Sequence, residues 1–178
     1  MSKTTVWTVI ACGLLAATAT AAFQPDQVAA EANWVVHADM AALRATEMGR
    51  YVITRLDEGA AARRMDALQV IIGFDPRRDV DSMTLYGPGG KDKDGVVIFK
   101  GRFDTEKLLA AVRLNESYQH LTHGEHDIHF WVDDQKQKDT YGAIGPNGSV
   151  LMSHTREMIE TALDVLDRKK PTLAGADK

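Results

Sequence analysis

Four of the six histidines of the chain lie at three-residue spacing within one short segment. They are His120, His123, His126 and His129. Imidazole is the commonest metal ligand among side chains, so this cluster is the first candidate for chemistry. The segment is rich in β-branched and aromatic residues and has Gly124 at its centre, which favours two strands and a turn over a helix. We therefore predict a β-hairpin.

A two-residue turn at Gly124 and Glu125 sets the register of this hairpin. The predicted cross-strand pairs are His123 with His126, His120 with His129, and Tyr118 with Trp131. Side chains alternate along a strand, so one face is expected in the core. Its members are Leu121, Ile128, Phe130 and Val132. The opposite, less buried face carries Tyr118, Trp131, His120 and His129.

Three interpretations of that second face stay open. Opposed imidazoles, with Cβ atoms about 4.5–5.5 Å apart, can hold one Zn²⁺ or Cu²⁺, and Asp127 on the same face offers a third ligand. Alternatively, Tyr118 and Trp131 with the histidines form an interaction face for a partner. The third interpretation is a plain solvated face that the Tyr–Trp pair stabilises. Zinc is the cofactor that the first interpretation implies, and the other two require none.

Three other motifs lack the residues or elements that a calcium, phosphate or catalytic site requires. The acidic run Asp75, Asp79 and Asp81 lacks the glycine and the oxygen ligands of a calcium loop. The run Gly87–Gly90 joins two predicted strands, so no helix N-terminus follows it to bind phosphate. Ser153 and His154 lie at a predicted helix start without a Gly-x-Ser-x-Gly elbow. We assign no catalytic residue, although an active site assembled from scattered residues stays open.

The N-terminus has the three-part layout of a secretory signal peptide at residues 1–22. Lys3 supplies the positive start, an apolar run follows from Thr5 to Ala17, and small residues end the segment at Ala22. The run is too short to cross a hydrocarbon layer of about 30 Å as a permanent helix. We expect a mature chain that begins at Ala22 or Phe23, is periplasmic or extracellular, and has no transmembrane segment.

Cys12 offers an alternative processing site, since Val9-Ile10-Ala11-Cys12 is similar to a lipobox. Few residues precede this cysteine and the apolar run continues beyond it, which favours cleavage after Ala21 or Ala22. The mature chain then has no cysteine and no disulfide, so its apolar core alone must stabilise it.

The charge of the chain excludes some partners. The net charge is −4, and removal of a segment whose one charged residue is Lys3 makes it −5. A nucleic-acid-binding domain needs a basic face, and so does a domain that binds anionic lipid. We expect neither partner.

Periodicity predicts one α+β domain at 23–170 and a disordered tail at 171–178. The expected strands are 34–37, 81–86, 96–103, 118–123, 126–133, 140–145 and 149–153. Between the first two strands we expect two helices, or one bent helix, that Asp39 begins and Gly73 ends. Asp104 and Thr155 are the expected N-caps of two later helices.

The order of these elements as far as His123 is βαββαβ, the split pattern of ferredoxin-like folds. Three further strands and a C-terminal helix extend it. We therefore predict an α+β fold with a mostly antiparallel sheet and helices on one face.

Several short motifs resemble an uncharacterised family of exported bacterial proteins that is common in planctomycetes. They are His37-Ala38-Asp39, Gly73-Phe74-Asp75-Pro76 with Asp79, Leu85-Tyr86-Gly87 and Lys100-Gly101-Arg102-Phe103-Asp104. The resemblance extends over most of the mature chain and implies export, but no activity.

These observations favour an exported, non-enzymatic binding or structural domain of the cell envelope or extracellular space. Its partner would be an envelope or extracellular protein or polymer. The alternative is a metal-binding or metal-dependent protein that uses His120 and His129.

Overall fold

The computed structural model describes residues 22–89, 95–133 and 137–176, in which the chain forms seven strands and six α-helices. The strands are β1 (Trp34–Asp39), β2 (Val80–Gly87), β3 (Val96–Gly101), β4 (Gln119–His123), β5 (His126–Asp133), β6 (Lys138–Ile144) and β7 (Val150–Ser153). The helices are α1 (Met40–Ala45), α2 (Glu47–Leu56), α3 (Gly59–Ile72), α4 (Pro76–Asp79), α5 (Thr105–Val112) and α6 (Arg156–Leu166). Short 3-10 turns are η1 (Pro25–Gln27), η2 (Pro146–Gly148) and η3 (Leu173–Gly175). The predicted signal peptide apart from Ala22, and with it Cys12, lies outside the described residues.

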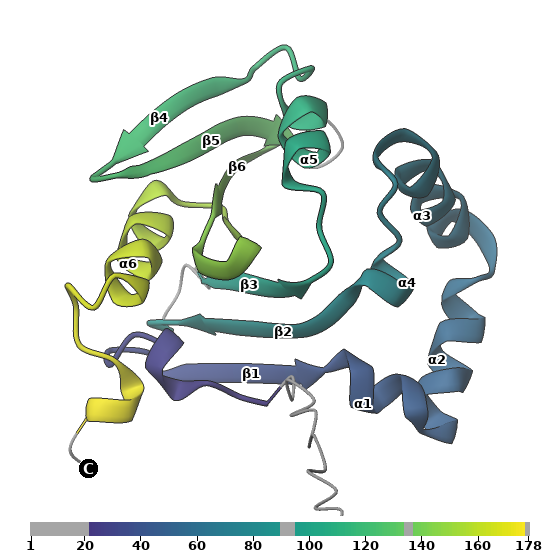
Figure 1. The fold of residues 1–178 in the computed structure, drawn as a ribbon, viewed down its shortest axis with the longest axis horizontal. Helices are drawn as coiled ribbons and strands as arrows, with labels where there is room; N and C mark the ends of the chain where they lie inside the picture. Colours follow the sequence, from purple (N-terminus) through teal and green to yellow (C-terminus); the bar gives the residue numbers. More distant parts are fainter. Residues whose placement is uncertain (1–21, 90–94, 134–136, 177–178) are drawn as a thin grey trace, which may run out of the picture.

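All seven strands belong to one sheet in the order β1-β2-β3-β7-β6-β5-β4 (Figure 1). Every neighbouring pair is antiparallel. The predicted α+β class and antiparallel sheet are therefore confirmed.

The predicted ferredoxin-like arrangement is not found. A split βαβ unit keeps its two strands parallel and leaves room for a third strand between them. Here β1 pairs directly and antiparallel with β2, and β4 lies at the opposite edge of the sheet. Helices α1 to α4 return the chain to the position beside β1, so they act as a long hairpin connection and not as a crossover.

Helices cover both faces of the sheet, so the prediction of helices on one face is wrong. Helix α6 packs on the face that carries Ile98, Leu151 and Ile128, which we call the core face. On the opposite face, here the outer face, α1 to α3 lie over Met83 and Phe99, and α5 lies over Val150 and Ile144. The run Val96–Phe99 explains why both faces need a cover, since it presents apolar side chains to each.

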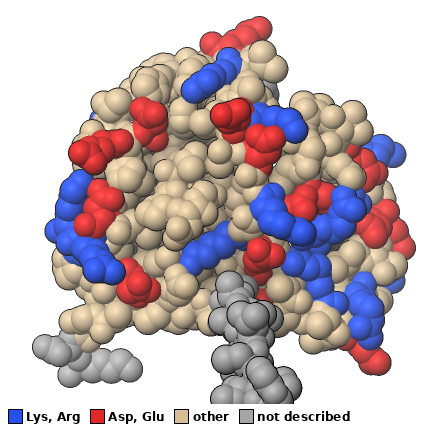
Figure 2. All heavy atoms as spheres, viewed as in Figure 1, with Lys and Arg blue, Asp and Glu red and all other residues tan. Residues whose placement is uncertain are grey.

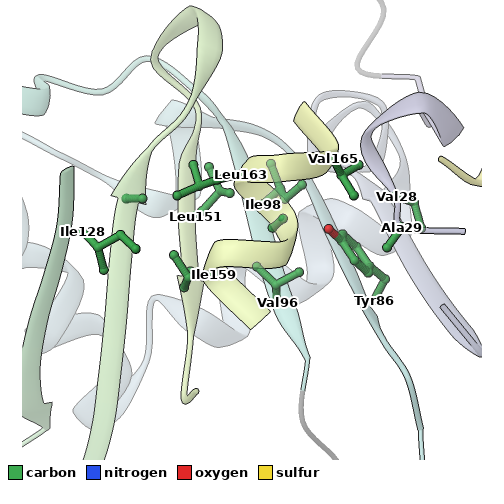
Figure 3. Packing of buried hydrophobic residues seen from close by; sticks show 12 residues of the cluster. Val28, Ala29, Tyr86, Val96, Ile98, Ile128, Leu151, Ile159, Leu163 and Val165 are labelled. Atoms are coloured by element: carbon green, nitrogen blue, oxygen red, sulfur yellow. The ribbon is translucent and has the colours of Figure 1, made fainter. Parts of the chain in front are cut away.

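The core lies between α6 and the sheet (Figure 3). Ile159, Ala162 and Leu163 recur at helical spacing on α6 and are fully buried. They pack with Ile98 and Leu151 from the central strands. Thr155 occupies the predicted N-cap position of α6, but the side chain that accepts a bond there is Ser153, whose Oγ lies 3.2 Å from the Thr155 N–H nitrogen.

The two ends of the described chain pair with each other. The Leu173 N–H donates to the Val28 carbonyl at 2.8 Å, and the Ala30 N–H donates to the Pro171 carbonyl at 3.1 Å. Val28 is fully buried in the core. The expectation of a disordered tail from Pro171 is therefore wrong as far as Ala176, because these backbone bonds tie the segment down.

The segment between β1 and β2 forms three successive helices and the short α4, where two helices or one bent helix were expected. Asp39 caps α1 as predicted, with Oδ1 accepting from the Ala42 N–H at 2.7 Å, and Gly73 ends α3 at a φ of 72°. Thr46 separates α1 from α2 by accepting from the Gly49 N–H at 2.9 Å. The apolar stripe of these helices is only partly buried. Exposed members include Met48, Tyr51, Val70 and Ile71.

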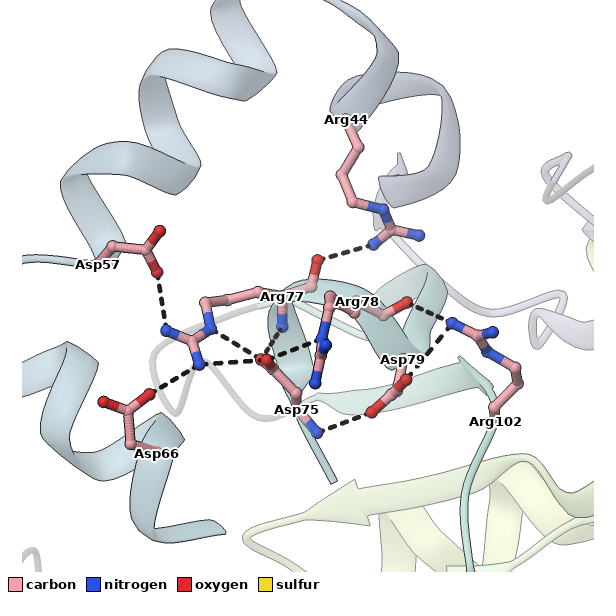
Figure 4. A network of polar contacts seen from close by, with 8 residues as sticks. All are labelled: Arg44, Asp57, Asp66, Asp75, Arg77, Arg78, Asp79 and Arg102. Carbon is pink, nitrogen blue, oxygen red and sulfur yellow. Dashed lines mark hydrogen bonds and ion pairs between the residues drawn. The ribbon is translucent and has the colours of Figure 1, made fainter. Parts of the chain in front are cut away.

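Arg77 holds this helical segment together (Figure 4). Its guanidinium contacts Asp57 at 2.7 Å, Asp66 at 2.8 Å and Asp75 at 2.8 Å. Asp75 is almost fully buried. One arginine therefore joins the end of α2, the middle of α3 and the cap of α4.

Charged side chains of both signs are intermixed on the surface (Figure 2) and are most crowded over α1 to α4. No extended area of a single sign appears on this side of the molecule. Within the described residues, none of the helices is both long enough and apolar enough to span a bilayer.

Candidate ligand-binding cleft

The β4–β5 hairpin forms with the predicted register. His120 pairs with His129 and His123 with His126, around a turn in which Gly124 has a φ of 58°. The predicted pair of Tyr118 with Trp131 is absent from this ladder, which begins at Gln119.

Tyr118 contacts His129 instead. Its Oη lies 3.0 Å from His129 Nδ1, and the two rings stack with centroids 6.0 Å apart. His129 is only 3% exposed, so the expectation of a less buried face is wrong at this position. The reason is α5, whose Leu108 and Leu109 line a cavity with His129 on the outer face.

The environment of His129 disfavours a charged imidazole. Burial lowers the pKa of this ring below its ordinary value, and nearby Arg113 and His120 lower it further. The ring of His120 lies 5.8 Å from that of His129, centroid to centroid. His120 Nε2 lies 2.8 Å from Asp127 Oδ1.

The three metal candidates His120, His129 and Asp127 are thus brought together as two pairwise contacts. A zinc site needs at least three protein ligands that converge on one point. In the part of the chain that the structure describes, no three His, Cys, Asp or Glu side chains are grouped to hold a metal ion.

The other two histidines of the cluster point to the core face and contact α6. His123 Nε2 lies 2.8 Å from Asp164 Oδ1, and His126 Nε2 lies 2.9 Å from Asp167 Oδ1. The pKa of Asp167 is lowered by hydrogen bonds from Lys169 and His126. These histidines therefore attach the hairpin to α6, a role that sequence reasoning missed because it requires the position of a helix distant in the chain.

The outer face also carries a cleft of about 350 Å³, which strand residues and their neighbours line. We call it the tryptophan cleft. Trp34 from β1 and Trp131 from β5 line it, and its apolar floor is formed by Leu85, Val97 and Met152. These floor residues are adjacent in the register of β2, β3 and β7. A cleft of this size lies at the lower end of the range for small-ligand sites.

Each indole lies against a glycine. A Cβ built on Gly95, directly before β3, would lie 2.8 Å from Cζ2 of Trp34. A Cβ built on Gly142 in β6 would lie 3.1 Å from Cζ3 of Trp131. Both rings therefore reach inward over the sheet from their own strands, and the missing side chains give them room.

The rim of the cleft is polar. Asp133 and His154 line it together with the buried Thr140 and Ser153. Ser153 Oγ donates to the Gly95 carbonyl at 2.8 Å, and His154 Nδ1 lies 2.8 Å from the Asp139 carbonyl oxygen. Each of these two side chains bonds to backbone, which fixes its orientation at the rim.

The prediction from sequence placed Trp131 in an interaction face. It did not identify Trp34, Asp133 or His154 as residues that line a cleft. Apart from Trp7 in the predicted signal peptide, Trp34 and Trp131 are the tryptophans of the chain. Each of these indoles lies against a glycine that is distant in the sequence, and this becomes visible only once the strand order is known.

The acidic run and the glycine-rich run have structural roles. Asp75 Oδ1 accepts from the Arg77 N–H at 3.0 Å at the start of α4, Asp79 Oδ2 accepts from the Asp75 N–H at 2.8 Å, and Asp81 lies near Arg44. The glycine-rich run joins β2 to β3, as expected, and residues 90–94 lie outside the described residues.

Comparison of the chain with protein-family models, with curated proteins and with solved structures found no match.

Proposed function

We propose that the protein is an exported, non-enzymatic binding domain of the cell envelope or extracellular space, and that the tryptophan cleft is its ligand site. The observation that carries this proposal is the pair of indoles, Trp34 and Trp131, each positioned over a glycine and both lining one open cleft. Aromatic side chains with a polar tip contribute large contact area at low conformational cost, which suits a binding site.

The contacts at the rim favour binding over catalysis. A nucleophile and its base must lie within hydrogen-bonding reach of each other. Ser153 and His154 are the nearest candidates for such a pair, but Ser153 donates to Gly95 and His154 bonds to Asp139. Their polar atoms serve to orient the rim.

The proposal of export depends on the layout of residues 1–22. Membership of the planctomycete-type exported family is part of the same proposal and depends on the short motifs. Three residues of its motifs, Asp39, Asp75 and Asp104, accept backbone N–H bonds at helix starts. Structural roles of this kind are compatible with a shared fold and imply no shared activity.

The metal-binding alternative has weaker support, because His129 is buried and already bonded to Tyr118. Zinc titration distinguishes this alternative from the proposed function.

Intrinsic fluorescence tests the proposed function, because Trp34 and Trp131 are the tryptophans of the expected mature chain. A panel of neutral oligosaccharides, choline and 8-anilinonaphthalene-1-sulfonate is titrated into the exported protein. We expect at least one member to change the emission and to protect it from acrylamide, and Trp34→Ala and Trp131→Ala to remove the binding. Leu114→Ala, at an exposed apolar residue outside the cleft, is the control. Absence of any response to the panel would contradict the proposal.

A further inference from the structure

We infer that the tryptophan cleft binds an uncharged saccharide chain, with one sugar ring against each indole; this inference rests on the proposed function. The first argument is the distribution of polarity. The cleft combines two indoles and an apolar floor of Leu85, Val97 and Met152 with a rim of Asp133, Thr140 and His154.

A pyranose has the complementary distribution. Its C–H groups form an apolar face that can pack on an aromatic ring, and its hydroxyl groups project from the edge. A wholly apolar ligand would remove water from Asp133 and His154 without replacing the hydrogen bonds to that water, which is costly. A sugar supplies both donors and acceptors at the edge, so those rim groups stay bonded.

Charge argues against an anionic ligand. Asp133 is a carboxylate at the rim, and the chain has a net charge of −4. A carboxylate at the cleft and a net negative charge both repel an anion. These two charges favour a neutral sugar over an acidic or phosphorylated one.

The spacing of the indoles points to more than one ring. Trp34 lies against Gly95, directly before β3, and Trp131 lies against Gly142 in β6. Strand β7 alone lies between β3 and β6. Two strand spacings amount to roughly 10 Å, which is about twice the length of one pyranose. A chain of two or more sugars can therefore contact both indoles, whereas a monosaccharide contacts one.

The floor keeps this spacing rigid. Met152 and Val97 are paired across β7 and β3, so the sheet itself fixes the distance between the two platforms. Preorganised sites bind with a lower entropic cost than sites that must form on binding.

The experiment titrates the exported protein with cellotetraose, chitotetraose, maltotetraose and glucose, and with choline as a cationic probe, by intrinsic fluorescence and calorimetry. We expect at least one tetrasaccharide to bind at least tenfold more tightly than glucose. Trp34→Ala and Trp131→Ala should each reduce that affinity at least tenfold, to near the level of the monosaccharide. Leu114→Ala should leave it unchanged.

The variant Asp133→Asn distinguishes binding of a sugar from binding of a cation in the cleft. Asparagine retains hydrogen bonding but removes the charge, so saccharide affinity should fall by no more than about tenfold, which corresponds to 1.4 kcal/mol, whereas binding of a cation should be lost. One contrary outcome is that choline binds, that Asp133→Asn abolishes this binding, and that no tetrasaccharide binds. This outcome would overturn the inference and leave the proposed function standing. Binding of 8-anilinonaphthalene-1-sulfonate alone would do the same. A tetrasaccharide that binds equally well to both tryptophan variants would also overturn it, because the site would then lie elsewhere.

Discussion

The indole of Trp131 lies over the backbone of Gly142, so close that a Cβ at residue 142 would require the ring to move. A Cβ there would lie 3.1 Å from Cζ3 and 3.2 Å from Cη2 of the ring. Gly142 thus helps to shape the proposed ligand site, because it sets the height of the Trp131 ring above the sheet.

Gly142→Ala should therefore displace Trp131 by a few tenths of an ångström. We expect a net loss of unfolding free energy of about 1 kcal/mol, because overpacking typically costs 1–3 kcal/mol and the gain from removing a glycine is smaller. The emission of Trp131 should shift to longer wavelength. Urea unfolding followed by fluorescence measures both effects. Gly175→Ala is the matched control, since a Cβ at Gly175 meets no atom within 4 Å. Equal behaviour of the two variants would show that Trp131 is not held by Gly142.

The buried hydroxyl of Tyr86 provides a test of the core. Among the described residues, Tyr86 Oη is the buried side-chain polar atom without a hydrogen-bond partner, and burial raises the pKa of this phenol. Tyr86→Phe removes an unsatisfied polar group and keeps the ring. We expect an unfolding free energy that is unchanged or higher by up to about 1 kcal/mol. A loss of more than about 1 kcal/mol in urea unfolding would reveal a partner for the hydroxyl.

Asp75 should make the stability sensitive to acid. Burial alone would raise the pKa of this carboxyl, but hydrogen bonds from the side chain and backbone of Arg77 outweigh it, so the pKa lies below the ordinary value of 3.8. For a lowered carboxyl pKa the stabilisation is complete above 3.8 and is lost as the pH falls through the folded-state value. Thermal unfolding between pH 7 and pH 2 should therefore show a steep loss below that point.

Two variants identify the group responsible. Asp75→Asn should weaken the contacts to Arg77 and Arg78, cost about 1–3 kcal/mol at pH 7 and flatten the acid limb of the profile. Asp66→Asn should cost less than about 1 kcal/mol, because Asp66 is mostly exposed. A profile that keeps its acid limb in Asp75→Asn would assign the effect to other carboxylates.

Much of the local structure follows from the sequence, since caps and tight turns depend on neighbouring residues. Asp39, Gly73 and Asp104 mark helix ends as predicted, and the turn at Gly124 fixes the pairing of His120 with His129. Periodicity also located every strand in the described residues.

The arrangement of those elements depended on contacts that sequence periodicity does not encode. The pairing of β3 with β7 brings Val97 beside Met152, and it is this pairing that places Trp34 and Trp131 around one cleft. The same limit explains the incorrect expectation for His129: its side of the hairpin was predicted correctly, but the helix that buries it was placed on the wrong face of the sheet.

Zinc titration tests the metal alternative. His129 Nδ1 is bonded to Tyr118, burial lowers the pKa of the His129 ring, and His120 Nε2 is bonded to Asp127. We expect calorimetry on untagged protein to detect zinc binding no tighter than millimolar, and His120→Ala and His129→Ala to leave it unchanged. A single micromolar site that both substitutions abolish would establish the alternative.

Export is tested by the N-terminus of the secreted protein. The layout of residues 1–22 predicts a mature chain that starts at Ala22 or Phe23. Mass spectrometry of the exported protein should give that start, and its melting temperature should be the same with and without dithiothreitol. Recovery of a lipid-modified chain that begins at Cys12 would instead indicate a membrane anchor.

The most direct test of the tryptophan cleft is nuclear magnetic resonance of the exported chain, which should show two indole N–H signals, from Trp34 and Trp131. On addition of a tetrasaccharide that binds, we predict that both signals shift together, along with the backbone amides of Val97 and Met152. The signals of Val70 and Ile71, which are exposed on α3, should stay in place. Shifts confined to α2 and α3, with both indole signals unmoved, would contradict the assignment of the cleft as the ligand site.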